Sequence, residues 1–236
     1  LDEIAGTQDE YRVLVVLRSD GSSLYATKDL PLAIKKFEEY DLDESIYVID
    51  ARQSLYMKQV FKTLGILGYE WADKLYHLAY ELVNLPGNVT MASREGTVVL
   101  FDDLVIEATS RAKAIVEAKN PELTGAQKDA IAEAVALGAL KYTMLSRDNM
   151  KVVTFDWDAA LDFNGQAAPY IQYAHVRAGS ILRKAGEESA KTCEFPDELE
   201  KAEVDLIELM TRLPNEVQRA SSEFRPLAIA NLAFEI

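Results

Sequence analysis

Cysteine and histidine are scarce in this chain of 236 residues, which has one cysteine and two histidines. A single cysteine excludes an internal disulfide bond and favours the reducing cytoplasm over a secreted location. Long apolar runs are absent too, since none approaches the roughly 18 residues that cross a membrane. The first residues have neither the basic start nor the apolar centre of a signal peptide. We therefore expect a cytoplasmic protein without a membrane partner.

Basic residues are outnumbered, with 25 Lys and Arg against 39 Asp and Glu and a net charge of −14. This balance argues against a protein that binds nucleic acid over its whole surface. The charges are unevenly placed, however. The stretch from Tyr170 to Lys184 has three basic residues and no acid, whereas the stretch 187–208 is strongly acidic. The composition therefore neither supports nor excludes one local face for RNA.

The first hundred residues alternate between predicted strands and helices. Short β-rich runs cover 11–17, 23–26, 45–50 and 75–83, and helical patterns cover 27–40 and 54–64. The run 45–50 has few polar residues, which is typical of a parallel strand buried on both faces. Pro31 is expected in the first turn of its helix, where the missing N–H costs nothing. The expected apolar face of the second helix consists of Leu55, Val60, Phe61 and Leu64. The alternation predicts a doubly wound α/β sheet, which binds ligands at the carboxyl ends of its strands.

From residue 102 onward the pattern is mainly helical. Helices are expected from 102, from a capping box at Thr124 to about Leu145, from Pro169 to a stop at Gly186, and over 196–213, 215–224 and from 226. Their expected core positions are Leu104, Val105, Ala108, Ala112, Ile115 and Val116, then Ile131, Val135, Leu137 and Leu140, then Ile171, Ala174, Ala178, Ile181, Leu182 and Ala185. A short extended piece, 151–155, interrupts the helices. The fold class is therefore α/β followed by all-α.

Three parts are expected, with the clearest boundary near residue 164: an α/β part over 1–100, a helical part over 101–163 and a helical bundle over 164–236. The last helix is still strongly apolar at Phe234, where the chain is about to end. A core-facing helix that ends within its pattern predicts that this chain is a fragment of a longer protein.

A small-residue loop over 91–96 follows a turn at 85–88 and leads into the apolar run 98–100. Its hydroxyl, guanidinium and backbone N–H groups suit a phosphate ligand. An ordinary loop in solvent is the alternative on composition alone.

Three polar residues, Tyr25, Asp29 and Gln53, lie at predicted strand ends. A carboxylate at this depth can pair with a guanidinium, and a phenol and an amide can fix its orientation. The structural alternative is that Asp29 caps a helix and Tyr25 belongs to the core.

Four motifs, in order, resemble those of the class I arginyl-tRNA synthetases. Residues 18–30, Arg-Ser-Asp-Gly-Ser-Ser-Leu-Tyr-Ala-Thr-Lys-Asp-Leu, resemble the first of these motifs. Residues 48–59, Val-Ile-Asp-Ala-Arg-Gln-Ser-Leu-Tyr-Met-Lys-Gln, resemble the next. Residues 91–99, Met-Ala-Ser-Arg-Glu-Gly-Thr-Val-Val, resemble the KMSKS loop, and 163–177 resemble the start of the anticodon-binding domain. The resemblance implies the second half of a Rossmann-like catalytic domain followed by a helical anticodon-binding bundle.

The resemblance also implies an aminoacyl-tRNA ligase that activates L-arginine with ATP and Mg²⁺ and transfers it to tRNA(Arg). Arginine would contact Tyr25, Asp29 and Gln53, with Asp29 facing the guanidinium. ATP would be bound near Tyr56, His77, Val83, Met91, Ala92, Ser93, Arg94 and Gly96, with Ser93 and Arg94 in the catalytic loop. tRNA would be contacted by Tyr170, Gln172, Arg177 and Arg183. No resident metal is implied, and a monomer is expected although the sequence does not determine it.

Several positions depart from the family pattern. Glu95 replaces the usual Lys, Ala92 the usual first Ser, Tyr56 the usual His and Ala167 the usual Thr. The His-x-Gly-His motif of class I synthetases is absent, so we expect this fragment alone to be inactive. Two alternatives stay open: a nucleotide-binding ligase or transferase with other substrates, and a non-catalytic RNA-binding or scaffolding relative.

Overall fold

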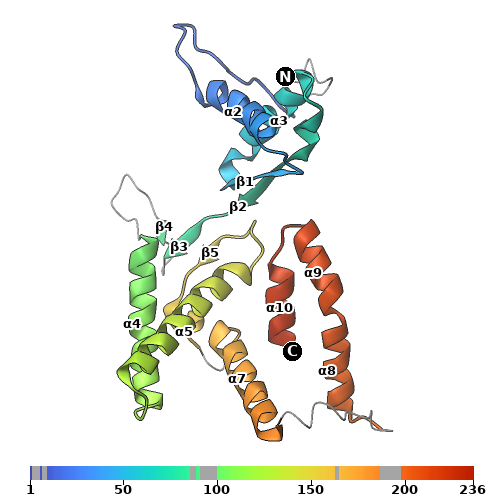
Figure 1. The fold of residues 1–236 in the computed structure, drawn as a ribbon. Helices are drawn as coiled ribbons and strands as arrows, with labels where there is room; N and C mark the ends of the chain where they lie inside the picture. Colours follow the sequence, from blue (N-terminus) through green and yellow to red (C-terminus); the bar gives the residue numbers. More distant parts are fainter. Residues whose placement is uncertain (2–5, 7–9, 86–88, 91–99, 163–164, 187–197) are drawn as a thin grey trace. The chain divides into compact units, whose positions relative to one another are not determined.

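The computed structural model describes residues 1, 6, 10–85, 89–90, 100–162, 165–186 and 198–236. It consists of two compact units, Leu1–Glu81 and Leu82–Ile236 (Figure 1). The three-part division at residues 100 and 163 does not follow from these units and stays a prediction. In the described ranges, no helix is both long enough and apolar enough to cross a membrane.

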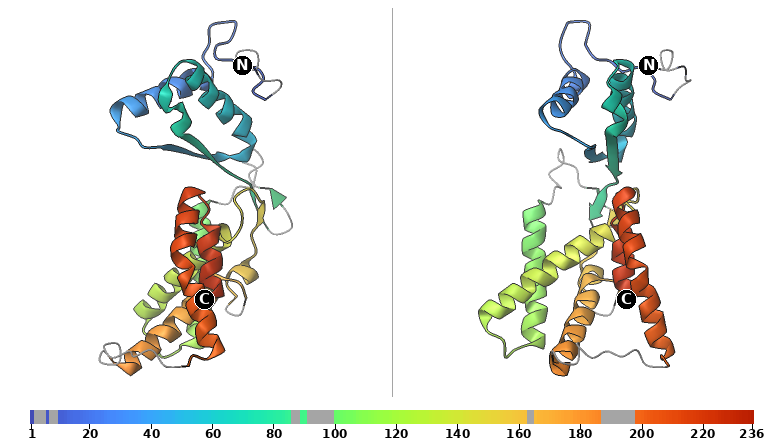
Figure 2. Two further views of the ribbon diagram at one scale, coloured as in Figure 1. Left: turned by 90° about the vertical axis from the view of Figure 1, so that its right-hand side faces the viewer. Right: turned by 45° about the vertical axis from the view of Figure 1, so that its right-hand side comes forward.

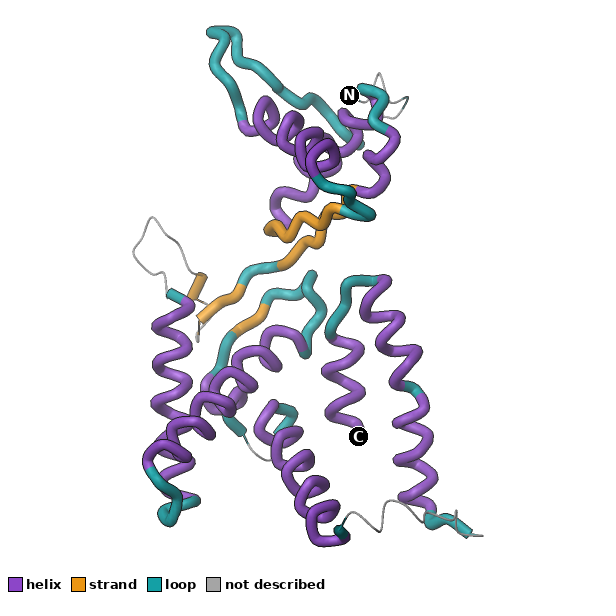
Figure 3. The backbone as a smooth tube through the Cα atoms, viewed as in Figure 1, coloured by secondary structure: helices purple, strands orange, loops and turns teal. Residues whose placement is uncertain are grey.

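The N-terminal unit is built around two parallel strands and two helices. Its elements are α2 (Tyr25–Glu39), β1 (Ser45–Asp50), the 3₁₀ turn η1 (Ala51–Gln53), α3 (Ser54–Ile66), the 3₁₀ turn η2 (Glu70–Lys74) and β2 (Leu75–Tyr80). The strands β1 and β2 pair in parallel from Ser45 opposite Leu75 to Asp50 opposite Tyr80. They run side by side in Figure 3. The helix α3 connects them, as a parallel pair requires. The predicted strand–helix–strand order is confirmed, with the strand predicted over 75–83 divided at Tyr80.

The core of this unit lies between its helices and one face of the strand pair. Buried Leu30 and Ala33 of α2 meet Val60 and Leu64 of α3, and Leu75 of β2 joins them. The rings of Phe37 and Trp71 stack beside this cluster with centroids 4.2 Å apart. Burying such side chains removes apolar surface from water and supplies most of the driving force for folding.

Two predictions about burial in this unit are wrong. The strand β1 is covered on one face only, because Val48 is 62% exposed while Tyr47 packs against the core. Leu55 is 37% exposed, since the buried face of α3 runs instead through Met57, Val60 and Leu64. Both segments form the predicted elements. Which of their faces is buried depends on tertiary contacts, which the apolar composition does not specify.

The segment 11–17 does not form the predicted strand. A single antiparallel bridge joins Leu17 to Ser23, and Val13 is 79% exposed. The side-chain amide of Gln59 donates to the carbonyls of Tyr11 and Val13. These carbonyls therefore bond to a side chain of α3 rather than to a neighbouring strand.

The first helix begins earlier than predicted. The Thr27 hydroxyl accepts a hydrogen bond from the Leu24 backbone N–H at 3.0 Å and fixes the helix start at Tyr25. Pro31 therefore lies in the second turn and not in the first. Proline has no backbone N–H, so the Thr27 carbonyl lacks the hydrogen bond that the residue four positions later normally donates in a helix. This loss destabilises the helix, and a proline in the first turn would have avoided it.

The C-terminal unit combines a small sheet with seven helices among the residues that the structure describes. Its strands are β3 (Val83–Leu85), β4 (Val89–Thr90) and β5 (Val153–Thr154), in the order β4-β3-β5. Its helices are α4 (Phe101–Lys119), α5 (Gly125–Leu145), α6 (Trp157–Ala160), α7 (Ala168–Ala185), α8 (Lys201–Thr211), α9 (Leu213–Ser222) and α10 (Leu227–Glu235). The last two lie side by side (Figure 2).

Small residues let α4 and α5 pack closely. Ala108 and Ala112 of α4 face Ala132, Ala136 and Ala139 of α5, all of them buried. The predicted α4 stripe is confirmed, with Val116 buried and Leu104, Val105 and Ile115 at its edge. The capping box at Thr124 is confirmed, because its hydroxyl and the Gln127 side chain each accept a backbone N–H of the other residue. Ile131, a predicted core position, is instead 39% exposed.

The helix α7 has the predicted bounds but not the predicted buried stripe. It ends at Gly186, whose φ of +78° suits glycine. Ile181 and Leu182, predicted to face inward, are 64% and 70% exposed. The buried residues of α7 are Ala168 and Pro169 in its first turn, because α5 and α10 contact the beginning of the helix.

Gly138 of α5 permits a hydrogen bond between helices. The Gln172 side-chain amide donates to the Ala134 carbonyl at 3.0 Å, and a Cβ at position 138 would lie 2.6 Å from that amide nitrogen. We expect Gly138→Ala alone to change the free energy of unfolding by less than about 0.5 kcal/mol, because about 1 kcal/mol of helix propensity offsets the lost bond.

The test is urea unfolding of the single and double variants. In a Gln172→Ala background the same Gly138→Ala change should stabilise by about 1 kcal/mol, because the displaced partner is already absent. Equal effects of Gly138→Ala in both backgrounds would show that the Gln172 bond contributes nothing.

Candidate functional site

A hydrogen bond between α2 and α3 links two polar residues of the N-terminal unit. The Tyr56 hydroxyl donates to Oδ2 of Asp29 at 2.5 Å, and both residues are half-buried. Burial and this bond raise the pKa of Tyr56 above its ordinary value of 10.0. The phenol therefore keeps its proton at neutral pH, and it is the donor in this pair.

This bond connects the two helices beside which the predicted arginine-contacting residues lie. Tyr25 and Asp29 are four residues apart on α2 and share a helix face. Gln53 precedes α3 directly and is one turn from Tyr56. The Asp29–Tyr56 bond therefore connects the helix that carries Tyr25 and Asp29 to the first turn of α3, which directly follows Gln53.

Neither structural alternative for these residues holds. Tyr25 is 83% exposed and so does not belong to the core. Asp29 does not cap α2, because the cap position is Leu24 and the first turn has no acidic residue. Asp29 instead bonds to a residue of α3.

The turn before Gln53 is fixed by an ion pair that the sequence analysis does not predict. Asp50, at the carboxyl end of β1, accepts the Arg52 backbone N–H at 2.8 Å. It also binds the Arg52 guanidinium through both oxygens, at 2.9 and 2.8 Å. The Arg52 hydrogen bonds lower the pKa of Asp50. The spacing Asp-x-Arg after a strand is a signal from which this clamp could have been predicted.

A pocket of about 340 Å³ opens beside Tyr25. Its lining residues are Arg18, Ser23, Leu24, Tyr25 and Lys28. Two cationic side chains and a hydroxyl at its edge suit an anionic ligand group. The Asp20 carboxylate shapes the hairpin that carries Arg18 by accepting the Ser22 hydroxyl and backbone N–H.

The residues predicted to contact ATP fall in different parts of the molecule. His77 lies on β2 in the N-terminal unit, where its Nε2 donates to the Ile49 carbonyl at 2.9 Å. Val83 lies on β3 in the C-terminal unit and packs against the core of that unit. Met91, Ala92, Ser93, Arg94 and Gly96 lie outside the described residues. Their predicted contacts with ATP therefore stay predictions.

The four residues predicted to contact tRNA all lie on α7, but on different faces. Tyr170 and Arg177 are seven residues apart and share one face, where the Arg177 guanidinium lies 5.7 Å from the centre of the Tyr173 ring. Tyr173, which sequence reasoning did not select, is 55% exposed there. Gln172 points to α5, where its amide nitrogen bonds to Ala134. Arg183 follows near the end of the helix and is exposed.

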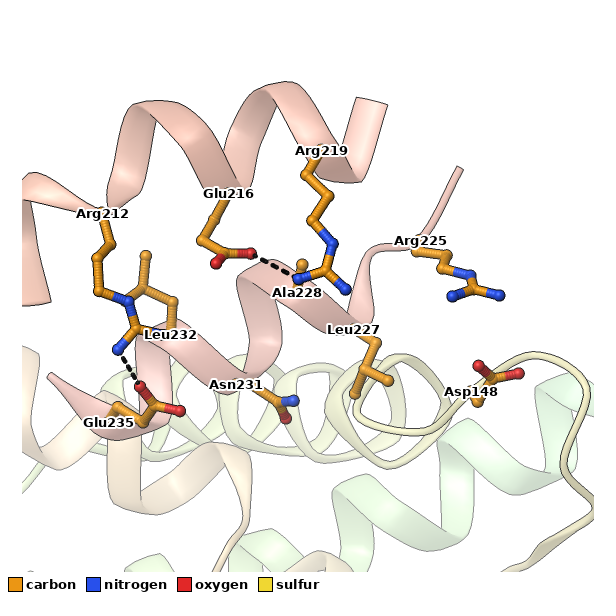
Figure 4. A pocket seen from close by; sticks show the side chains of 10 residues that line it. All are labelled: Asp148, Arg212, Glu216, Arg219, Arg225, Leu227, Ala228, Asn231, Leu232 and Glu235. Atoms are coloured by element: carbon orange, nitrogen blue, oxygen red, sulfur yellow. Dashed lines mark hydrogen bonds and ion pairs between the residues drawn. The ribbon is translucent and has the colours of Figure 1, made fainter. Parts of the chain in front are cut away.

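A charged pocket of about 160 Å³ lies between α9, α10 and the turn after α5 (Figure 4). Its charged residues are Asp148, Arg212, Glu216, Arg219, Arg225 and Glu235. Arg212 pairs with Glu235 at 2.9 Å and Arg219 with Glu216 at 3.7 Å. Three cations and three anions neutralise each other, so this pocket has no excess charge for a phosphate. None of the predicted site residues lines it.

Within the described parts of the chain, no group of three or more His, Cys, Asp or Glu side chains could hold a metal ion.

Two family models match this chain. The model for the catalytic domain of class I tRNA synthetases of the R type matches residues 5–157. The model for the DALR anticodon-binding domain matches residues 171–236. Together the two matches confirm the predicted fold class, a class I catalytic domain followed by a helical anticodon-binding domain.

Curated relatives and solved structures agree with the family models. An arginine–tRNA ligase from Streptococcus thermophilus is 40% identical over 223 residues, which is 94% of this chain and 39% of the relative. One from Clostridium botulinum is 34% identical over 97% of this chain and 40% of its own length. The chain thus spans about two fifths of the curated relatives that it matches.

Two solved structures share this fold. Arginyl-tRNA synthetase from Thermus thermophilus superposes with a TM-score of 0.84 at 32% identity, over 98% of this chain and 43% of that protein. The arginyl-tRNA synthetase of Plasmodium falciparum, at 20% identity and a TM-score of 0.74 over 96% of this chain and 39% of that protein, shows the fold alone. From the ordered motifs, the two domain models and this fold, the chain belongs to the class I arginyl-tRNA synthetase family.

Proposed function

We propose that the protein that carries this chain is an ATP-dependent arginine–tRNA ligase, which activates L-arginine and transfers it to tRNA(Arg). The observation that carries the proposal is the Asp29 carboxylate, which accepts the Tyr56 hydroxyl and lies four residues after Tyr25 on α2, while Gln53 directly precedes the helix that carries Tyr56. A fixed carboxylate between a phenol and an amide suits a guanidinium, which is planar and always charged. The family of the chain supports the same substrate.

The proposed site distinguishes arginine from neutral amino acids of similar shape by the charge of the guanidinium. Asp29 pairs with the guanidinium, while Tyr25 and Gln53 orient the rest of the amino acid. A neutral side chain of similar shape would leave the carboxylate without a counter-charge in a partly desolvated site, and such mismatches are rejected strongly.

ATP, with Mg²⁺ bound to its phosphates, is the proposed second substrate. In the sequence, the loop from Met91 to Gly96 offers the Ser93 hydroxyl and the Arg94 guanidinium to phosphate oxygens. Glu95 is the unusual feature of this loop, because a carboxylate near triphosphate opposes binding unless it points away. His77 and Val83 complete the proposed ATP-contacting set, whereas the hydroxyl of Tyr56, which the resemblance places near ATP, bonds to Asp29 instead.

The proposed tRNA contact lies on α7. Tyr170, Tyr173 and Arg177 offer aromatic rings and a guanidinium on one exposed face, and these groups stack on unpaired bases. Gln172 and Arg183 are further proposed contacts. A cytoplasmic location remains the expectation from the single cysteine, and a monomer remains the expectation for the oligomeric state, which the sequence does not determine.

The experiment is arginine-dependent exchange of pyrophosphate into ATP by the full-length protein, followed by charging of tRNA(Arg). Exchange with arginine but not with lysine is expected. Binding of tRNA without exchange would instead identify a non-catalytic relative, which the departures Ala92 and Glu95 would then explain. Exchange with another amino acid would indicate a ligase of different specificity. This chain alone is expected to show no exchange.

A further inference from the structure

The side chain at position 56 has a role in the candidate site that neither the family models nor the relatives assign. Tyr56 stands in the first turn of α3, three residues after Gln53. Its hydroxyl reaches across to α2 and donates to Oδ2 of Asp29 at 2.5 Å. Among the residues that the structure describes, no second hydrogen bond reaches this carboxylate.

We propose that Tyr56 is a positioning residue for arginine recognition: it holds Oδ2 of Asp29 so that Oδ1 faces the guanidinium. This inference rests on the proposed function. A carboxylate on a helix surface rotates about two side-chain bonds, and ordering it costs conformational entropy each time a ligand binds. The Tyr56 hydroxyl orders it before arginine arrives, so less affinity is lost on binding.

The ring of Tyr56 is suited to this role because it is anchored in the core. It packs against the cluster of Leu30, Ala33, Val60, Leu64 and Leu75. Burial and the bond to Asp29 raise the pKa of Tyr56, so the phenol remains a donor at neutral pH. The bond also ties Gln53 to Asp29 through the first turn of α3, which fixes the spacing of the two arginine-contacting groups.

The test is the substitution Tyr56→Phe in the full-length protein, which removes the hydroxyl and leaves the packed ring. We expect the KM for arginine to rise about tenfold, as for loss of a hydrogen bond to a charged group, with the KM for ATP unchanged. Tyr40→Phe is the matched control, because Tyr40 is 62% exposed in the same unit. It should leave both KM values at the wild-type level.

A double-mutant cycle with Asp29→Asn separates positioning from a structural role. If Tyr56 acts through Asp29, Tyr56→Phe has little further effect on arginine once Asp29 is Asn. The same tenfold loss in both backgrounds, or an equal rise in the KM for ATP, would overturn the inference. A Tyr56→Phe enzyme whose KM values for arginine and ATP equal those of Tyr40→Phe would also overturn the inference.

The wild-type result separates this inference from the proposed function. A wild-type protein without arginine-dependent exchange would refute the proposed function itself. An active wild type with an unaffected Tyr56→Phe variant would refute only the role of Tyr56. Melting temperatures of Tyr56→Phe and Tyr40→Phe, measured together, show whether a lost fold explains any loss of activity.

Discussion

Replacing Asp29 by Asn should lower kcat/KM for arginine by about 100- to 1000-fold in the full-length protein. The substitution keeps the size of the side chain and removes its charge, so the guanidinium loses its counter-ion in a partly desolvated site. Truncating one partner of such a hydrogen-bonded charge pair costs about 2–5 kcal/mol. Steady-state pyrophosphate exchange at varied arginine measures the effect, and the KM for ATP should stay unchanged.

Asp43→Asn is the matched control for this prediction. Asp43 lies in the loop between α2 and β1 and is exposed, so the same chemical change there should leave the kinetics at the wild-type level. An Asp29→Asn enzyme with less than about a fivefold loss would show that another group binds the guanidinium. An equal loss for arginine and ATP would point to a damaged fold.

Replacing Phe155 by Ala should lower the free energy of unfolding of the C-terminal unit by about 3–5 kcal/mol. Phe155 is 2% exposed and belongs to the cluster between α4, α5 and α6. Its ring meets the Trp157 ring edge-on, with centroids 4.8 Å apart, and its backbone N–H donates to the Asn84 carbonyl at 2.9 Å. Truncation removes the ring contacts and leaves a cavity between the helices and the strand β5.

Tryptophan fluorescence during urea unfolding measures this effect. The chain has two tryptophans, and Trp71 and Trp157 lie in different units. A Trp71→Phe background therefore isolates the signal of the C-terminal unit. Phe101→Ala is the control, because Phe101 is 67% exposed and its loss should change stability by less than about 0.5 kcal/mol. Similar effects of both substitutions would contradict the assignment of Phe155 to the core.

Local signals in the sequence predicted the elements well. The capping box at Thr124, the glycine stop at Gly186 and the apolar stripe of α4 depend on residues within one or two helical turns. Such signals depend on residues that are close in the sequence, so they can be recognised without knowing the tertiary contacts. The alternation of strands and helices likewise required only periodicity, and the parallel pairing of β1 and β2 followed from it.

Contacts between distant residues were the part that the sequence did not reveal. Leu55, Val48, Ile181 and Leu182 are exposed, because burial depends on which neighbour covers each face and periodicity alone does not identify that neighbour. In the segment 11–17, the carbonyls of Tyr11 and Val13 accept hydrogen bonds from Gln59, more than forty residues away, and the β-rich composition of the segment does not reveal that partner.

In the candidate site too, the sequence predicts local features but not the contacts between distant residues. The places of Tyr25, Asp29 and Gln53 at predicted strand ends, together with the family resemblance, predict an arginine-contacting set. The bond from Tyr56 to Asp29 spans 27 residues, and the predicted place of Tyr56 was beside ATP. Only the packing of α3 against α2 shows that its hydroxyl is directed to the carboxylate.

The most direct test of the central claim, that Asp29 recognises a guanidinium by its charge, is calorimetric titration of the full-length protein with L-arginine and L-citrulline. Citrulline has nearly the same shape as arginine but is neutral at its end. The account predicts that arginine binds and that citrulline binds at least about 100-fold more weakly. Equal affinity for the two ligands would contradict recognition through the Asp29 carboxylate.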